Sequence, residues 1–289
     1  MTTRTLQYVI ESVPTSDGAG VKLRRSLGRA HQLRMDPFLM LDEFSSDNPD
    51  DYIAGFPPHP HRGFETVTYM LDGHMRHEDH LGNRGELKSG GVQWMTAGRG
   101  IVHSEMPQQE SGRMRGFQLW INLPSAEKMK PASYRDIPPS DIPMANLPNG
   151  GRAKVIAGNL ALDDGLVAGP IQGLTTDPFY IDVELPPGGV FSHPVRSEYH
   201  AFVYPYEGSI YVGPSDASRT LKKQNAGVLA EGDRVEVRAG DDGARFILLA
   251  ARPLGEPIAQ YGPFVMNTRE EIEQAINDYQ SGAFTRSAA

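Results

Sequence analysis

Apolar and polar side chains alternate over short stretches of the chain. This pattern predicts β-strands, because successive side chains of a strand point to opposite faces. Residues 66–70 combine β-branched and aromatic side chains, and residues 92–95 and 117–122 are further strand-like segments. Asp72 and Gly73 follow the first of these segments and predict a hairpin turn. The 31 glycines and 23 prolines among 289 residues allow many such turns, so we expect an all-β protein.

An internal repeat suggests how the chain is divided. The order of glycine, histidine, tyrosine and glycine in residues 55–73 resembles the order in residues 189–208. A chain of 289 residues is also long for one hydrophobic core. We therefore expect two similar barrels. Prolines and glycines are concentrated in residues 135–151, the expected linker between an N-terminal domain of residues 1–134 and a C-terminal domain of residues 152–289.

One helix is expected near the end of the sequence. Thr268 and Glu271 have the spacing of a capping box, in which the two side chains satisfy free N–H groups of the first turn. Apolar residues follow at helical spacing, and Gly282 is a typical stop. These residues are Ile272, Ala275, Ile276 and Tyr279. We expect this apolar stripe to pack on a barrel, and a helix that binds a partner protein is the alternative.

The composition restricts the function classes. The chain has no cysteine, which excludes disulfides, thiolate metal sites, iron–sulfur clusters and cysteine nucleophiles. The net charge of −8 argues against a polyanion as the main partner, so we expect no direct nucleic-acid binding. The first residues do not resemble a signal peptide, and no apolar run is long enough to cross a bilayer. A cytoplasmic protein without membrane association is expected.

Two short segments carry the candidate chemistry. His59 and His61 are two residues apart, which places both imidazoles on one face of a strand. His103 and Glu105 have the same spacing. If the two segments lie opposite each other in a barrel, three imidazoles and one carboxylate converge, a set that suits a divalent transition metal. Four such ligands on an octahedral ion leave two adjacent positions open, for dioxygen and an organic substrate. Fe(II) is preferred, although Ni, Cu, Mn and Zn also fit these ligands.

Two carboxylates have open roles. Glu105 is expected to bind the metal and is also the candidate catalytic base, since a metal-bound carboxylate can loosen and accept a proton, and the alternative is a fixed ligand with no role as a base. Glu65 follows His61 by four residues. It could be a further ligand or, as we prefer, an acceptor that orients a ligand histidine.

Other clusters are given structural interpretations. Residues 74–80 contain three histidines, but we expect a solvated hairpin there rather than a second metal site. The basic residues between positions 22 and 29 are expected on a solvated edge strand that their charge keeps from pairing. Four aromatic or sulfur-containing residues are candidates to line an apolar pocket, and ordinary core positions are the alternative for each of them, namely Phe56, Trp94, Met95 and Trp120.

Five segments resemble the pirin family of the cupin superfamily: residues 36–44, 58–69, 93–107, 118–123 and 262–268. The resemblance implies a bicupin of two tandem jelly-roll β-barrels with a short C-terminal helix. It also implies one iron ion in the N-terminal barrel, held at His59, His61, His103 and Glu105. Family members are associated with quercetin 2,3-dioxygenase activity, and some bind transcription factors or metabolic enzymes.

The second barrel is expected to lack a metal. His193 is followed by Pro194 and Val195, so the second imidazole of the pair is missing, and no histidine follows His200.

The leading hypothesis is an iron-dependent dioxygenase that opens a flavonol ring with dioxygen. The alternative is a regulatory protein without enzymatic activity, whose metal controls binding to a protein partner.

Overall fold

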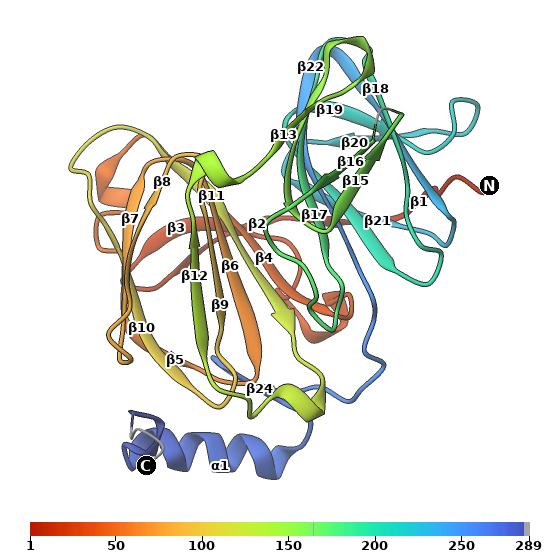
Figure 1. Ribbon diagram of the computed structural model, residues 1–289. Coiled ribbons are helices and arrows are strands. Elements are labelled where there is room, and N and C mark those ends of the chain that lie inside the picture. Colours follow the sequence, from red (N-terminus) through yellow and green to blue (C-terminus); the bar gives the residue numbers. More distant parts are fainter. Residues whose placement is uncertain (164, 286–289) are drawn as a thin grey trace. The chain divides into compact units, whose positions relative to one another are not determined.

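The segments with alternating polarity form strands in the computed structural model, which describes residues 1–163 and 165–285 (Figure 1). The three expected strands lie within β6 (Phe64–Asp72), β9 (Val92–Thr96) and β11 (Met114–Asn122). The expectation of an all-β protein is confirmed, and the strands form two cupin barrels.

The first barrel is built from two sheets. The larger has the order β12-β9-β6-β11-β4-β3-β2, and the smaller has the order β5-β10-β7-β8. Apolar side chains from both sheets fill its interior, among them Met70, Met75 and Leu87. Its other strands are β2 (Val13–Asp17), β3 (Val21–Arg25), β4 (Phe38–Ser46), β5 (Phe56–His61), β7 (His74–Asp79), β8 (Arg84–Lys88), β10 (Ile101–Pro107) and β12 (Ser133–Ile137), with the separate hairpin β23 (Ala259–Tyr261) and β24 (Phe264–Met266).

The second barrel has its own core around a nine-stranded sheet. The main order is β1-β21-β19-β22-β17-β14-β13, and β18 and β20 pair with β22 and β19. Its buried side chains form a separate cluster that includes Ile181, Val203 and Leu248. The strands are β1 (Leu6–Glu11), β13 (Met144–Asn146), β14 (Arg152–Ala157), β17 (Phe179–Leu185), β18 (Val190–Pro194), β19 (His200–Val212), β20 (Arg219–Lys222), β21 (Asn225–Leu229) and β22 (Arg234–Ala251), with the hairpin β15 (Asn159–Leu162) and β16 (Gly165–Ala168).

The expected division at residues 134 and 152 would give two units that are each continuous in sequence. Neither of the two compact units in the structure is continuous. Residues 1–13 belong to the second barrel, where β1 pairs with β21. The segment that begins at Leu254 belongs to the first barrel. The expected linker contains the end of β12 and the whole of β13. The alternation of polarity identifies these strands, but it does not say which sheet edge each of them joins.

The hairpin expected at Asp72 and Gly73 is wrong. β6 pairs with β9 and β11, whereas β7 pairs with β8 and β10 in the other sheet. Gly73 therefore connects two sheets rather than two paired strands. Its positive φ of 120° suits such a corner as well as a tight turn, so the dipeptide alone does not distinguish them.

The helix prediction is confirmed in α1 (Arg269–Gln280). Thr268 Oγ1 accepts a hydrogen bond from the Glu271 backbone, and Glu271 Oε2 accepts one from the Thr268 backbone. Ile272 and Ala275 pack against β24, within the first barrel. Short 3-10 turns occur at His31–Leu33, Pro49–Asp51, Ser125–Glu127, Pro139–Asp141, Pro148–Gly150 and Ala283–Thr285. No helix among the described residues has the length and apolar character needed to span a bilayer.

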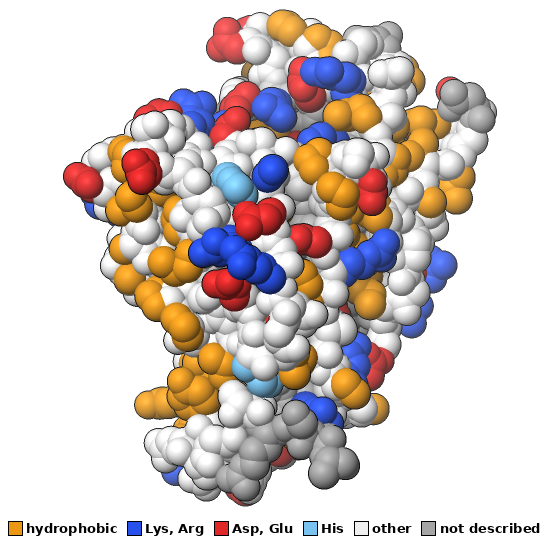
Figure 2. Space-filling view, turned by 60° about the vertical axis from the view of Figure 1, so that its left-hand side comes forward, with side chains coloured by type: hydrophobic (Ala, Val, Ile, Leu, Met, Phe, Trp, Pro, Cys, Tyr) orange, Lys and Arg blue, Asp and Glu red, His pale blue; other side chains and the backbone are white. Residues whose placement is uncertain are grey.

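Charged side chains of both signs are mixed on the face of the protein that Figure 2 presents. Figure 2 shows lysine and arginine interspersed with aspartate and glutamate on the face that it presents. Exposed pairs such as Arg113 with Asp47, at 3.0 Å, are examples. This mixture differs from the continuous basic surface that is typical of nucleic-acid-binding proteins.

Candidate metal centre

Strand β5 positions two of the candidate ligands. Three of its six residues are prolines, which lack an N–H group and are tolerated at the edge of a sheet. β5 is such an edge strand, and β10 is its neighbour. His59 and His61 flank Pro60, so their side chains leave the same face. His103 of β10 lies directly opposite His59 in the antiparallel register.

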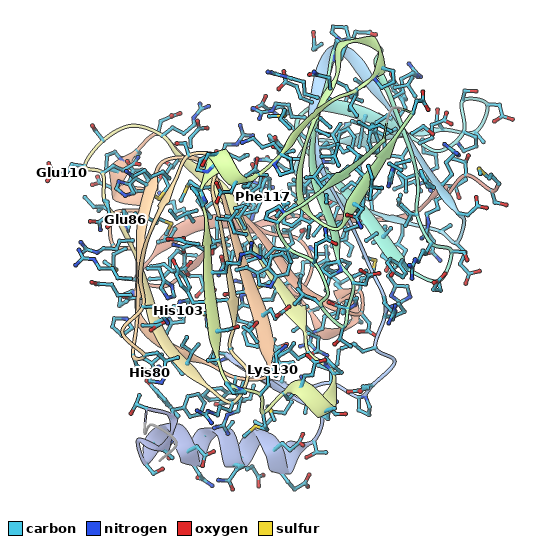
Figure 3. The ribbon with its side chains drawn as sticks, viewed as in Figure 1. His80, Glu86, His103, Glu110, Phe117 and Lys130 are labelled. Carbon is cyan, nitrogen blue, oxygen red and sulfur yellow. The ribbon has the colours of Figure 1, made fainter. Side chains whose placement is uncertain are left out.

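The three imidazoles converge. Their ligand nitrogens lie within 4.8 Å of one another, and the ring centroids are 4.4 to 4.9 Å apart. His103 is buried among the strands of the first barrel (Figure 3). Nε2 of His103 has no hydrogen-bond partner among the described residues, and His61 has no well-aligned one, although the nearby Pro263 backbone partly opposes the lowering of the His61 pKa. Because buried nitrogens without partners are costly, these groups fit a metal ion that would bind them.

The protonation of the site also suits a metal. Burial lowers the pKa of His61 and of His103 well below the usual value, and the neighbouring imidazoles lower both further. The neutral ring keeps the lone pair that a metal needs. In His59, Nδ1 donates to the Pro57 carbonyl at 2.8 Å, which leaves Nε2 as the nitrogen that can bind.

Glu105 faces the same cavity as His59 and His61, on the next inward position of β10 after His103. Its Oε1 accepts a hydrogen bond from Thr68 Oγ1 at 2.8 Å, and Thr68 also contacts Gln118 Oε1 at 2.5 Å. Since Thr68 has one proton, it can donate to only one of them, and turning the Gln118 amide would let that side chain donate to Thr68. Glu105 is outside the group of three converging histidines, so its role as a metal ligand remains a prediction.

Among the described residues, Glu65 accepts no hydrogen bond from a histidine. β5 ends at His61 and β6 begins at Phe64, so the strand alternation is interrupted between His61 and Glu65. Glu65 Oε1 instead accepts a hydrogen bond from Thr96 Oγ1 at 2.7 Å, and burial raises the pKa of this carboxyl. As an acceptor, Glu65 therefore holds Thr96 rather than a ligand histidine, and its alternative role as a further metal ligand remains a prediction.

A cavity of about 590 Å³ adjoins the histidines. Its volume lies in the range of small-molecule pockets, roughly 300–1,000 Å³. Of the expected lining residues, Phe56 and Trp120 contribute, whereas Trp94 and Met95 are buried elsewhere in the barrel. Other apolar side chains in the lining are Leu23, Leu39, Met40, Phe44 and Met75.

The basic segment has a different role from the one expected. β3 lies between β4 and β2 and is not an edge strand. Arg25 lines the cavity and donates two hydrogen bonds to Asp42, at 2.8 and 2.7 Å. Burial raises the pKa of Asp42 to about 6, and the Arg25 guanidinium opposes this shift. This polar pair in an apolar pocket was not identified from the sequence, because the two residues are 17 positions apart.

The histidine-rich segment is only partly solvated. β7 and β8 form the expected hairpin, but His77 is buried behind the site and contacts His103, with 3.3 Å between the two Nδ1 atoms. His80 Nδ1 accepts a hydrogen bond from the backbone of Val102, the residue before His103, at 3.1 Å. A signal was present in the sequence, since His77 and Asp79 have the same spacing as His103 and Glu105.

In the second barrel, His193 is stacked against Phe179, with centroids 4.8 Å apart. Among the described residues, the three histidines of the first barrel are the group whose ligand atoms converge for a metal. The absence of a metal from the second barrel remains a prediction.

Comparison with known proteins identifies the family. Residues 20–121 match the family model described as Pirin, and residues 180–285 match the Pirin C-terminal cupin domain. A Pseudomonas aeruginosa protein with the provisional name quercetin 2,3-dioxygenase is 54% identical over 271 residues, 93% of this chain and 94% of that protein. Human pirin is 43% identical over 269 residues, 92% of this chain and 89% of that protein.

Comparison with a solved structure supports the same family assignment. The crystal structure of a quercetin 2,3-dioxygenase from Acinetobacter baumannii has a TM-score of 0.87 and 33% identity, with 98% of both chains covered. The two family models and the relatives span both barrels and the histidine segments. The chain therefore belongs to the pirin family.

Proposed function

We propose that this protein is an iron-dependent dioxygenase that opens the ring of a flavonol-like phenol with dioxygen. The observation that carries the proposal is the convergence of three imidazoles beside a largely apolar cavity of about 590 Å³. The names of the Pseudomonas and Acinetobacter relatives support a flavonol as the substrate class.

His59, His61 and His103 would hold the metal, with Glu105 as the proposed fourth ligand. Bound Fe(II) would supply the redox chemistry toward dioxygen that no amino-acid side chain provides. The task of the chain is to position the substrate beside the metal and to keep bulk water away.

Glu105 is the proposed base for the substrate hydroxyl. Thr68 holds Oε1, so Oε2 would bind the metal and could accept the proton of the substrate hydroxyl when it loosens from the metal. Thr68 and Gln118 line the cavity together with Glu105, so they fix the carboxylate on the side from which a phenol would approach. The aromatic side chains of Phe56 and Trp120 offer flat apolar surfaces to an aromatic ring.

The test is a turnover measurement with Fe(II) loaded under anaerobic conditions. On admission of oxygen, the quercetin absorbance should fall and carbon monoxide should be released. The His103→Ala variant should bind less iron and lose most of this activity. Full activity in His103→Ala would remove the metal from the reaction, and an iron-loaded protein without turnover would contradict the dioxygenase proposal.

A further inference from the structure

A series of hydrogen-bonding side chains extends from His103 of the metal site through residues that do not line the cavity. His103 Nδ1 lies 3.3 Å from His77 Nδ1, and His77 Nε2 lies 3.3 Å from Asp79 Oδ2. All three side chains are buried, with 2% of His103, 2% of His77 and none of the Asp79 side chain exposed. Their contacts are therefore protected from competition by water.

Strand register explains this arrangement. β10 pairs with β7 in antiparallel fashion, with His103 opposite Asp79 and Glu105 opposite His77. Directly opposed residues of paired strands have their side chains on the same face, and aromatic side chains also reach diagonal neighbours. His103 and His77 are such a diagonal pair. The ring of Tyr134 stacks on His77, with centroids 4.1 Å apart and planes inclined by 17°, and restricts its orientation.

Counting protons assigns the tautomers. Asp79 accepts hydrogen bonds from the backbone of Leu81 and from the backbone and side chain of Asn83, as a carboxylate does. The adjacent His77 Nε2 then donates to Asp79, and one proton lies between the Nδ1 atoms of His77 and His103. His103 can bind a metal through Nε2 only if its Nδ1 carries this proton and donates it to His77. The remaining nitrogen, His103 Nε2, has a free lone pair and faces the other imidazoles, with no hydrogen-bond partner among the described residues.

We propose that His77 and Asp79 are positioning residues of the metal site. Asp79 sets the tautomer of His77, and His77 sets the tautomer and the ring orientation of His103. Metal-binding histidines commonly donate their second N–H group to a carboxylate or carbonyl, and here a second imidazole is inserted before the carboxylate. The inference rests on the metal centre of the proposed function, but not on iron or on the substrate.

The decisive variant is His77→Phe, which keeps an aromatic ring against Tyr134 and removes the acceptor. His77→Asn is the conservative partner, because its amide oxygen can occupy the place of Nδ1. His74→Phe is the matched control: it removes a histidine from the same strand, one that pairs with Glu86 at 2.6 Å outside this chain of contacts. Folding of each variant is checked by circular dichroism and thermal unfolding.

Two measurements test the proposal. Titration with Co(II) should show about ten- to hundredfold weaker binding for His77→Phe, a smaller loss for His77→Asn and wild-type binding for His74→Phe. NMR of the ring nitrogens in the metal-free wild type, assigned with a His103→Gln variant, should show a protonated Nδ1 and an unprotonated Nε2 in His103. The same tautomer should no longer predominate in His77→Phe.

The outcomes separate this inference from the proposed function. Wild-type Co(II) affinity in a folded His77→Phe protein, or a protonated Nε2 in the wild-type His103, would overturn the positioning role. If His77→Phe does not fold, the wild-type NMR measurement still decides. A wild-type protein that binds Co(II) as predicted and shows the expected tautomers, but never turns over quercetin when loaded with Fe(II), would contradict only the dioxygenase.

Discussion

Glu105 and Glu65 are both buried carboxylates on strands of the first barrel, but they have different surroundings. Glu105 lines the cavity and is held by Thr68, whereas Glu65 is held by Thr96 and does not line the cavity. A carboxylate can accept a proton from a bound molecule only if it lies at the surface of the cavity that the molecule occupies. The difference in position therefore separates a candidate base from a structural group.

Substitution of Glu105 tests this distinction. Glu105→Gln keeps the size and can still accept a hydrogen bond from Thr68, but it cannot take up a proton. We expect kcat to fall by about 10²- to 10⁴-fold, as for loss of a general base. Steady-state turnover of the Fe(II)-loaded variant, corrected for measured iron content, checks this. Glu65→Gln is the control and should retain most of its activity, and equal losses in the two variants would contradict the assignment.

His193 is a buried histidine far along the chain from the metal ligands. Burial lowers its pKa from 6.5 to about 4. The unfolded protein therefore binds more protons than the folded protein between these values, so stability falls as the pH decreases through this window. Its ring is flanked by Phe179 and Phe191.

A phenylalanine at this position should remove that pH dependence. From pH 7 to pH 5, the free energy of unfolding of the second barrel should fall by about 2 kcal/mol more in the wild type than in His193→Phe. Urea unfolding at the two pH values, followed by a probe in the second barrel, measures the difference. Parallel curves for the two proteins would show that His193 does not titrate in this range.

At the scale of elements, the C-terminal segment stabilises the turn after β5, the strand that carries His59 and His61. Arg62 follows His61 and pairs with Asp278 of α1 at 2.8 Å. Lys128 Nζ donates to the carbonyls of Gly63 and Val265, at 2.8 and 3.0 Å. Gly63 has a φ of +87°, and a Cβ atom there would lie 1.9 Å from the Val265 carbonyl oxygen, so only glycine fits.

Removal of the contact between Arg62 and Asp278 of α1 should destabilise this turn. In Asp278→Ala the Arg62 side chain, 5% exposed, loses its carboxylate partner. We expect the first barrel to lose about 1.5–3 kcal/mol of stability, the range for a hydrogen bond to a charged group. Urea unfolding gives the value. Glu273→Ala, which breaks the exposed pair with Arg269 on the same helix, should change stability by less than about 1 kcal/mol, and a similar loss in both variants would contradict the argument.

At the scale of the whole molecule, two units with separate cores share one chain. The converging histidines belong to the first unit, and the cluster around Ile181 and Leu248 belongs to the second. A ligand that binds only the folded form of one unit stabilises that unit by mass action. Metal binding is therefore expected to act unequally on the two barrels.

Hydrogen exchange can resolve this difference. Added Ni(II) at one hundred times its dissociation constant should raise the opening free energy of slowly exchanging amides in β9 and β10 by about 2.7 kcal/mol. Amides of β19 and β22 should be unchanged. A chelator should reverse the effect, and equal protection of both barrels would contradict a single metal site.

Much of this protein follows from its sequence by itself. Alternating polarity determines the strands, the Thr268 and Glu271 spacing determines the helix, and the spacing of His59 and His61 places two imidazoles on one face. These features depend on neighbours within a few residues, where backbone geometry alone relates one side chain to the next. The segments that resemble pirins are each continuous in sequence, so they identified the family without the tertiary structure.

Tertiary structure decided what depends on distant strands. The pairing of β10 with β7 brings His77 and Asp79 behind His103, and the interruption of the strand after His61 turns Glu65 toward Thr96. The pairing of β3 with β4 places Arg25 beside Asp42. Tertiary structure also decided that β1 pairs with β21 and that the C-terminal segment belongs to the first barrel. Sheet register relates residues far apart in the chain, and local alternation carries no information about which strands will pair.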